Sequence, residues 1–188
     1  MMDTLTTLHN RVSASRMATE EPAPEVLESV FRAALRAADH GRLRPWRFLV
    51  IRGEARARLG DLFADTILAA NPGIRDAKLD KARGKALRSP VIVVAISSPR
   101  PHPKVPAFEQ ELSTGAAVQN MLNAAYALEL GAIWRTGPMA DAPQVRNGLG
   151  LEHEERIIGF LYLGYPDSPP RPAPDLSVAD FFREWPAE

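Results

Sequence analysis

The sequence contains no cysteine, which excludes disulfides, thiolate metal sites and cysteine nucleophiles. It also lacks a long hydrophobic run: the longest, 91–96, is far too short to span a bilayer. Residues 1–16 are polar and lack the apolar centre of a signal peptide. Basic and acidic residues balance at 23 each, so the basic excess typical of a nucleic-acid-binding protein is missing. We therefore expect a cytoplasmic protein that binds neither nucleic acid nor membrane, in which any redox chemistry belongs to a bound cofactor.

Several catalytic signatures are also absent from the sequence. No Gly-x-Gly-x-x-Gly follows a strand, and there is no phosphate-binding loop ending in Gly-Lys-Ser/Thr. The Gly-x-Ser-x-Gly of esterases is missing, and the four histidines lie too far apart to form a metal-ligand pair. Elimination leaves a binding protein, or an enzyme whose chemistry is carried by a cofactor.

The pattern of apolar residues predicts one domain of 188 residues, 1–188, with helices separating short strands. The predicted helices are 4–11, 24–38, 54–70, 76–87, 108–130 and 141–150, and the predicted strands are 46–51, 91–96, 132–135 and 156–164. The strand 91–96 is apolar at every position, as in a strand covered on both faces. This order indicates an α+β or α/β protein with a helix-flanked sheet.

Two segments have an unusual distribution of apolar residues. The helix 108–130 is small and apolar nearly all round, so we expect it inside the molecule or against a partner subunit. Residues 166–188 contain six prolines but also Phe181, Phe182 and Trp185, which a disordered tail would not usually carry. We interpret 166–188 as an extended C-terminal arm that docks on a surface, such as that of a second subunit.

Three segments resemble the nitroreductase family when they are taken together and in order. Residues 10–16 resemble its N-terminal Arg-x-Ser element, and residues 33–48 resemble its helix-loop-strand, which ends in Pro-Trp and a strand aromatic. Residues 131–137 are similar to the Gly-x-x-Trp-Arg-Ser-Gly of a compact, YdjA-like branch. Residues 104–106 and 159–166 also fit that branch, so the resemblance covers almost the whole chain.

This resemblance implies a three-layer α/β/α arrangement of the α+β class, with a central, mostly antiparallel sheet. It implies a homodimer with FMN at the subunit interface and a C-terminal arm exchanged between subunits. The implied activity is an NAD(P)H-dependent reduction of nitroaromatic, quinone or similar small electron-poor acceptors in a ping-pong cycle of hydride transfer. Since the flavin carries the chemistry, no catalytic protein residue is expected.

The same resemblance assigns eight residues to the FMN site, and their chemistry suits a flavin. A phosphate needs cations and hydroxyls, and a reduced flavin ring is stabilised by donors on its pyrimidine side. Residues near a strand end also offer free backbone N–H groups. The expected FMN contacts are Arg11, Val12 and Ser13 in the loop, Arg36 and His40 from the second subunit, and Trp134, Arg135 and Thr136. The spacing of Arg36 and His40 predicts one helical face for both.

Departures from the family pattern leave a second hypothesis open. Val12 replaces an arginine, Ala38 a proline, Arg42 an asparagine and Arg44 a glutamine. A flavin-binding protein without significant turnover, acting as a sensor, store or scaffold, is therefore the alternative. The choice between NADH and NADPH is also open; the candidate cations for a 2′-phosphate are Arg42, Arg44, Arg47, Arg100 and Lys104.

Overall fold

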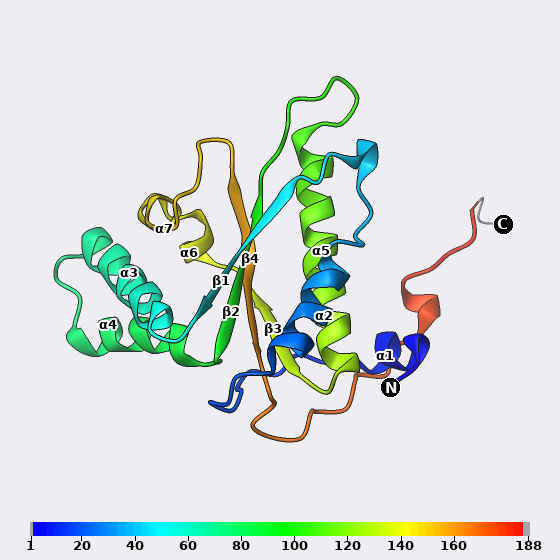
Figure 1. Cartoon of the computed structure of the whole chain (residues 1–188), viewed down its shortest axis with the longest axis horizontal. Helices are drawn as coiled ribbons and strands as arrows, with labels where there is room; N and C mark the ends of the chain where they lie inside the picture. Colours follow the sequence, from blue (N-terminus) through cyan, green and yellow to red (C-terminus); the bar gives the residue numbers. More distant parts are fainter. Residues whose placement is uncertain (1, 186–188) are drawn as a thin grey trace.

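The centre of the fold is a four-stranded antiparallel sheet (Figure 1), seen in a computed structural model that describes residues 2–185. The strands lie in the order β1-β2-β4-β3. Their bounds are β1 Trp46–Arg52, β2 Val91–Ser97, β3 Gly131–Arg135 and β4 Arg156–Gly164. Every residue of β2 is buried, which confirms the prediction of a strand covered on both faces.

Helices cover the two faces of this sheet and make three layers (Figure 1). On one face lie α2 (Pro24–Ala34) and the long α5 (Ala107–Ala127), with α1 (Thr4–Asn10) against α5. The other face carries α3 (Ala55–Ala70), α4 (Asp76–Arg83), the 3₁₀ turn η2 (Gly84–Leu87), α6 (Pro138–Asp141) and α7 (Pro143–Gly148). The predicted α+β class with an antiparallel, helix-flanked sheet is confirmed. Among residues 2–185, no helix combines the length and the apolarity that crossing a membrane requires.

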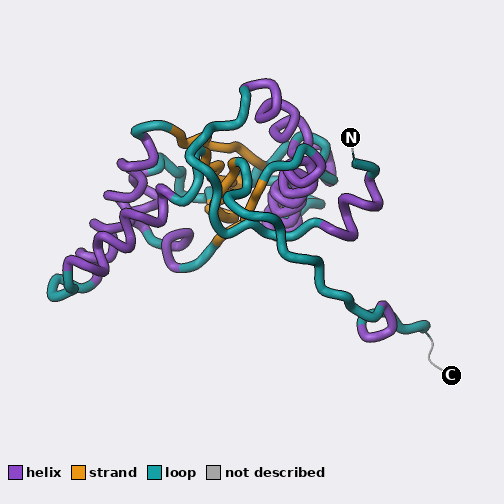
Figure 2. Tube along the Cα trace, turned by 90° about the horizontal axis from the view of Figure 1, so that it is seen from below, coloured by secondary structure: helices purple, strands orange, loops and turns teal. Residues whose placement is uncertain are grey.

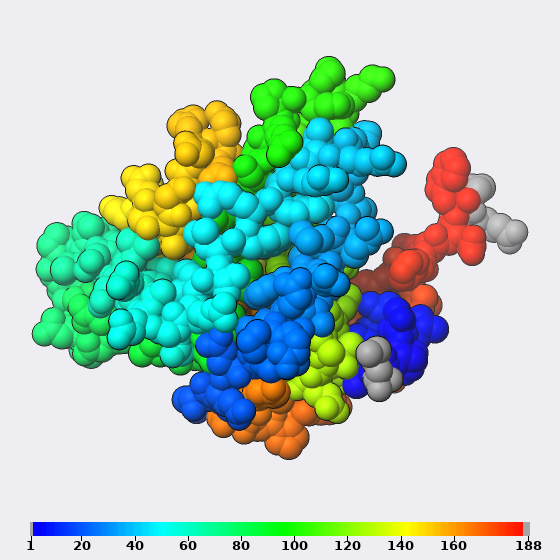
Figure 3. All heavy atoms as spheres, viewed as in Figure 1, coloured from blue at the N-terminus to red at the C-terminus, as the bar shows by residue number. Residues whose placement is uncertain are grey.

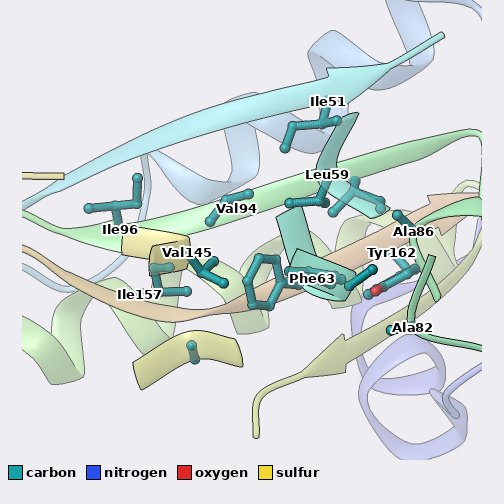
Figure 4. Close-up of a cluster of buried hydrophobic side chains, with 14 of the residues drawn as sticks. Ile51, Leu59, Phe63, Ala82, Ala86, Val94, Ile96, Val145, Ile157 and Tyr162 are labelled. Atoms are coloured by element: carbon teal, nitrogen blue, oxygen red, sulfur yellow. The ribbon is translucent and has the colours of Figure 1, made fainter. Parts of the chain in front are cut away.

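Alternation along the strands divides the core into two clusters, one on each face of the sheet. Under α3, Phe63 meets Phe160 edge to face, with ring centroids 5.5 Å apart. Figure 4 shows Leu59 and Phe63 of α3 against sheet side chains such as Val94. The residues next to these along each strand, such as Val93 and Leu161, point to the opposite face and pack under α2 and α5.

The helix that starts at Pro24 is shorter than predicted. It ends at Ala34, and the chain then turns into a short 3₁₀ turn, η1 (His40–Arg42). The predicted helix reached residue 38 because Leu35 and the alanines after it are apolar. In the structure Leu35 is 59% exposed and does not contribute to either core cluster. Arg36 and His40 therefore do not share a helical face, and that prediction is wrong.

Proline divides another predicted helix. In place of one helix over 141–150, the structure has α6 and α7, each with a proline in its first turn. Pro143 has no backbone N–H to continue the hydrogen bonds of α6, so the chain ends one helix and begins the next there.

The polar segment 71–88 is packed into the core and does not form a separate flap. Leu79 and Ala82 of α4 and Ala86 of η2 are buried in the cluster under α3. Gly60 of α3 touches α4 so closely that an added Cβ would lie 2.6 Å from the carbonyl oxygen of Arg83.

The C-terminal arm leaves the body of the molecule after β4 (Figures 2 and 3). It is extended except for a 3₁₀ turn, η3 (Val178–Asp180). Its large apolar side chains are mostly exposed, from 63% for Leu176 to 93% for Trp185. Residues 186–188, the last of the predicted arm, and residue 1 of the predicted domain lie outside the described residues.

Candidate functional site

The segment after α1 runs along the free edge of β3. The backbone N–H of Ala14 donates to the carbonyl of Ala132 over 3.0 Å. Further along, the N–H of Met17 donates to Arg88 over 3.3 Å and that of Ala18 to Tyr165 over 2.9 Å. These bonds bring residues 14–18 beside the start of β3, the end of β4 and the entrance to β2.

Trp134 is an anchor for the end of β3. A register shift between β2 and β4 occurs next to Ile158, whose carbonyl accepts a 3.1 Å hydrogen bond from the Trp134 indole. The indole lies directly over Gly159, where an added Cβ would come within 2.1 Å of Nε1. Only glycine allows this close approach. The Trp134 side chain is therefore packed against β4, and this packing fixes the position of the main chain of residues 134–136.

A cavity of about 610 Å³ opens beside the end of β3, on the α3 side of the sheet. We call it the β3 cleft. Three cations, Lys85, Arg88 and Arg135, lie among its apolar walls. The apolar walls come mainly from Phe63, Ile67, Ile133, Pro138, Met139 and Phe160. The volume and the mostly apolar lining are typical of a small-molecule site.

Two smaller cavities extend from the β3 cleft toward the N-terminal segment. One, of about 440 Å³, shares Arg88 and Arg135 with the cleft and adds Ser15 and Arg16. The next, of about 250 Å³, shares Ser15 and Arg16 and adds Ser13 and Arg171. The lining thus changes from apolar to hydroxyl-bearing and cationic along one path.

The cations of this path form no ion pair in the described part of the chain, unlike arginines elsewhere, although Asp167 lines the same cavity as Arg16 and Arg88. Arg47, Arg52 and Arg83, for example, each contact a carboxylate at 3.1 Å or less. By contrast, Nε of Arg135 is buried without any hydrogen-bond acceptor among residues 2–185. The same holds for Nη1 of Arg11, which lies outside these cavities. A buried N–H without an acceptor is unfavourable, and an anion bound beside Arg135 would provide that acceptor.

Arg135 also shapes the electrostatics of the cleft floor. Its guanidinium lies over the Tyr162 ring, 5.9 Å from the ring centroid. Burial raises the pKa of the Tyr162 phenol above its ordinary value, and the positive charges of Arg135 and Arg88 oppose that rise. Tyr162 therefore stays neutral and presents a hydroxyl to the cleft.

These features fit the cofactor expected from the sequence. FMN combines a flat, largely apolar ring with a polar chain that ends in a phosphate. The path offers an apolar cavity for a ring at one end and hydroxyls with unpaired arginines for a phosphate at the other. No three His, Asp or Glu side chains in the described part of the chain are grouped to hold a metal ion.

The structure brings together some of the eight expected site residues and separates others. Trp134, Arg135 and Thr136 line the β3 cleft, and Ser13 lines the smallest cavity of the same path. Val12 lines a different, mostly apolar cavity of about 260 Å³. Arg11 lines none of these cavities, although its buried Nη1 lacks a partner.

Arg36 and His40 lie away from the β3 cleft. Arg36 lines a separate cavity at the end of α2. The His40 Nδ1 is 2.8 Å from the Glu109 carboxylate, and both side chains are at least 42% exposed. Within one chain they cannot belong to the same site as Arg135.

Sequence reasoning missed three cations that the fold brings to this path, Lys85, Arg88 and Arg171. Lys85 and Arg88 stand three residues apart just before β2, in a segment that looked like an ordinary polar helix. The available signal was their position: cations that immediately precede a buried central strand lie at the edge of the sheet.

A sequence profile described as "Nitroreductase family" matches residues 8–165. The chain is 43% identical over 165 residues to a protein of Escherichia coli strain K12 named "Putative NAD(P)H nitroreductase YdjA", covering 88% of this chain and 89% of that protein. A Haemophilus influenzae protein named "Putative NAD(P)H nitroreductase" is 33% identical over 164 residues, 87% of this chain and 88% of its own.

Solved structures share the fold at low sequence identity. A nitroreductase-like family protein from Bacillus cereus superposes with a TM-score of 0.87 at 21% identity, covering 100% of this chain and 98% of its own. A nitroreductase with bound FMN from Bacteroides fragilis superposes with a TM-score of 0.74 at 17% identity, covering 98% and 99%. At such identities the likeness is one of fold.

Proposed function

The chain belongs to the nitroreductase family, and we propose that it is an FMN-dependent oxidoreductase that uses NAD(P)H to reduce small electron-poor acceptors such as nitroaromatics or quinones. The observation that carries this proposal is the β3 cleft with its path of unpaired cations. Its apolar end suits a flavin ring, and its cationic end suits a phosphate. The two core clusters share one sheet, which supports a single domain over 1–188.

Each group of residues has a distinct task in this proposal. Ser13, with Arg11 and the nearby Arg16, holds the phosphate by charge-assisted hydrogen bonds. Arg135 holds the negative side of the cofactor, and the main chain of Trp134 and Thr136 orients the ring. Val12 contributes only its backbone, because its side chain faces another cavity.

When bound, FMN supplies a carrier that accepts hydride from NAD(P)H and passes it to the acceptor. The protein needs no nucleophile of its own; its residues bind, orient and exclude water. Donor and acceptor use the same apolar cavity in turn, so we propose ping-pong kinetics.

A homodimer completes the site. In this arrangement Arg36 and His40 reach the flavin of the partner subunit, which accounts for their distance from the β3 cleft within one chain. Two exposed apolar surfaces support the dimer. Phe108 and Leu112, 66% and 57% exposed, form one face of α5, and the arm carries Phe181, Phe182 and Trp185. We propose that the arm packs on the partner.

The first prediction concerns the visible spectrum of the purified protein. We expect flavin absorption bands that bleach when NADPH or NADH is added without oxygen and return when a quinone is added. Bands that persist with both nicotinamides would contradict the oxidoreductase and favour a flavin-binding protein without turnover. Absence of flavin, with no binding of added FMN, would refute the site itself.

The second prediction concerns the oligomeric state. Size-exclusion chromatography with light scattering is expected to give twice the chain mass of 20.6 kDa. Replacing Phe181 and Phe182 by serine should raise the dimer dissociation constant at least about tenfold, because buried aromatic anchors dominate such interfaces.

The matched control for the serine substitutions at Phe181 and Phe182 is Leu68→Ser. Leu68 is also an exposed apolar residue, 40% exposed, but it lies on α3, away from the arm. We expect it to leave the dimer intact. A monomeric wild-type protein would contradict the shared site.

A further inference from the structure

A second cavity, of about 550 Å³, lies between the end of α2 and the start of β1, and it is lined by three arginines. We call it the arginine pocket. Its lining comprises Leu35, Arg36, Asp39, Arg42, Arg44 and Trp46, together with Ala37. Its volume lies within the range of roughly 300–1,000 Å³ of ligand sites.

None of the three arginines is neutralised within the described chain. Residues 2–185 provide no carboxylate or carbonyl partner for the guanidinium groups of Arg36, Arg42 or Arg44, whereas Arg32 and Arg47 nearby are each paired with a glutamate. The one carboxylate in the pocket is Asp39, and its oxygens accept from the backbone N–H groups of Leu43 and Arg44 at 3.1 and 2.8 Å. The pocket therefore has a net positive charge.

The backbone holds two of these arginines in place at a conformational cost. Arg42 and Arg44 have φ values of 54° and 50°, a left-handed conformation that side-chain-bearing residues seldom adopt, and Gly41 before them has φ 76°. The Asp39 carboxylate fixes this loop through its two hydrogen bonds. Strained residues of this kind concentrate at ligand sites, because elsewhere nothing offsets the strain.

We propose that the arginine pocket binds the adenosine 2′-phosphate of NADPH and makes the enzyme prefer NADPH to NADH. A 2′-phosphate carries close to two negative charges and matches the planar donors of Arg42 and Arg44. Trp46 and Leu35 provide an apolar wall for the adenine ring. The inference rests on the proposed function, in which NADPH is one of the two nicotinamide donors.

Two other assignments fit less well. The FMN phosphate has its own unpaired cations along the β3 cleft, on the opposite face of the sheet from α2. Of the other cations suggested by the sequence, Arg47 is hydrogen-bonded to Glu155, and Arg100 and Lys104 lie outside the pocket.

The test compares kcat/KM for NADPH and NADH in the wild type and in Arg42→Asn, Arg44→Asn and the double variant. Asparagine tolerates left-handed φ values, so the loop can keep its shape. We expect the wild type to favour NADPH at least about tenfold and the double variant to lose that preference. The loss should appear mainly in KM, because the 2′-phosphate is remote from the reacting carbon.

The matched control is Lys104→Gln, which removes the same charge from an exposed position on a neighbouring loop. It should keep the wild-type ratio within about twofold. Equal use of NADH and NADPH by the wild type, or a preference that survives in the double variant, would overturn the proposal.

A calorimetric titration decides the same question without turnover. Adenosine 2′,5′-bisphosphate should bind the oxidised wild-type holoprotein at least about tenfold more tightly than adenosine 5′-monophosphate, and the double variant should not discriminate. Equal binding of both nucleotides by the wild type would overturn the inference. That result would leave the proposed function standing, since bleaching of the flavin tests it separately.

Discussion

Replacing Arg135 by glutamine is expected to weaken FMN binding about 100-fold while leaving the flavin-free protein as stable as before, or more stable. Arg135 lines both the β3 cleft and the cavity next to it, and its Nε is buried without an acceptor. A hydrogen bond to a charged group contributes roughly 1.5–3 kcal/mol, and about 2.7 kcal/mol corresponds to 100-fold in affinity. In the flavin-free protein the same unpaired charge is a cost, so its removal does not destabilise the fold.

Two measurements separate a binding role from a structural one. Fluorescence titration of the apoprotein with FMN gives the dissociation constant, and thermal unfolding of the apoprotein gives its stability. The control is Arg156→Gln on the neighbouring strand, whose exposed guanidinium lies 3.4 Å from Glu111 and touches no part of the cleft. A fall of several degrees in the melting temperature of the Arg135 variant, with FMN affinity unchanged, would show that Arg135 serves only to stabilise the fold.

The fold could be predicted from the sequence wherever burial leaves a local pattern. The apolar runs 91–96 of β2 and 157–163 of β4 could be recognised because a strand covered on both faces has no alternation of polar and apolar residues. The ends of helices were harder to predict from the sequence. The sequence shows that Leu35 is apolar but not that it is exposed. The predicted helix therefore extended beyond Ala34, where α2 ends.

The site depends on features that no local pattern contains. The resemblance of residues 131–137 led to Trp134, Arg135 and Thr136, and all three line the β3 cleft. The indole of Trp134, however, is held by the carbonyl of Ile158 and the space above Gly159, a contact between two strands at a register shift. Likewise, the sequence shows 23 basic residues but not which of them have a counterion. Only the fold reveals that Arg47 is paired and Arg135 is not.

The second large effect is expected at the ion pair between Arg47 and Glu155: the variant Glu155→Gln should have a lower free energy of unfolding than the wild type. Glu155 is buried, and its two carboxylate oxygens accept from Arg47 Nε and Nη2 at 2.6 and 2.5 Å. The N–H of Glu152 adds a third hydrogen bond at 3.0 Å. These bonds tie the start of β1 to the loop before β4. Removing one partner of a buried pair typically costs about 3–5 kcal/mol. Because Arg47 is about one-third exposed, we expect roughly 2 kcal/mol at pH 7.

The pH dependence of stability provides a sharper test of the same pair. The hydrogen bonds from Arg47, opposed by burial and aided by the N–H of Glu152, lower the pKa of Glu155 from 4.5 to about 2. A lowered carboxylate pKa stabilises the folded state above the unfolded pKa, and this stabilisation is lost as the pH falls toward the folded pKa. Wild-type stability, measured by urea unfolding, should therefore fall between pH 5 and pH 2, and that of Glu155→Gln should fall less steeply.

The neighbouring Glu154 provides the matched control for the pH experiment. Its side chain is 81% exposed and its partner, His153, is 97% exposed, so the pair lies in water although the two atoms are only 3.0 Å apart. Exposed ion pairs contribute little, and Glu154→Gln should change the unfolding free energy by less than about 0.5 kcal/mol. It should also keep the wild-type slope between pH 5 and pH 2. Equal slopes in all three proteins would mean that Glu155 titrates normally and that its pair with Arg47 does not hold the sheet to the loop.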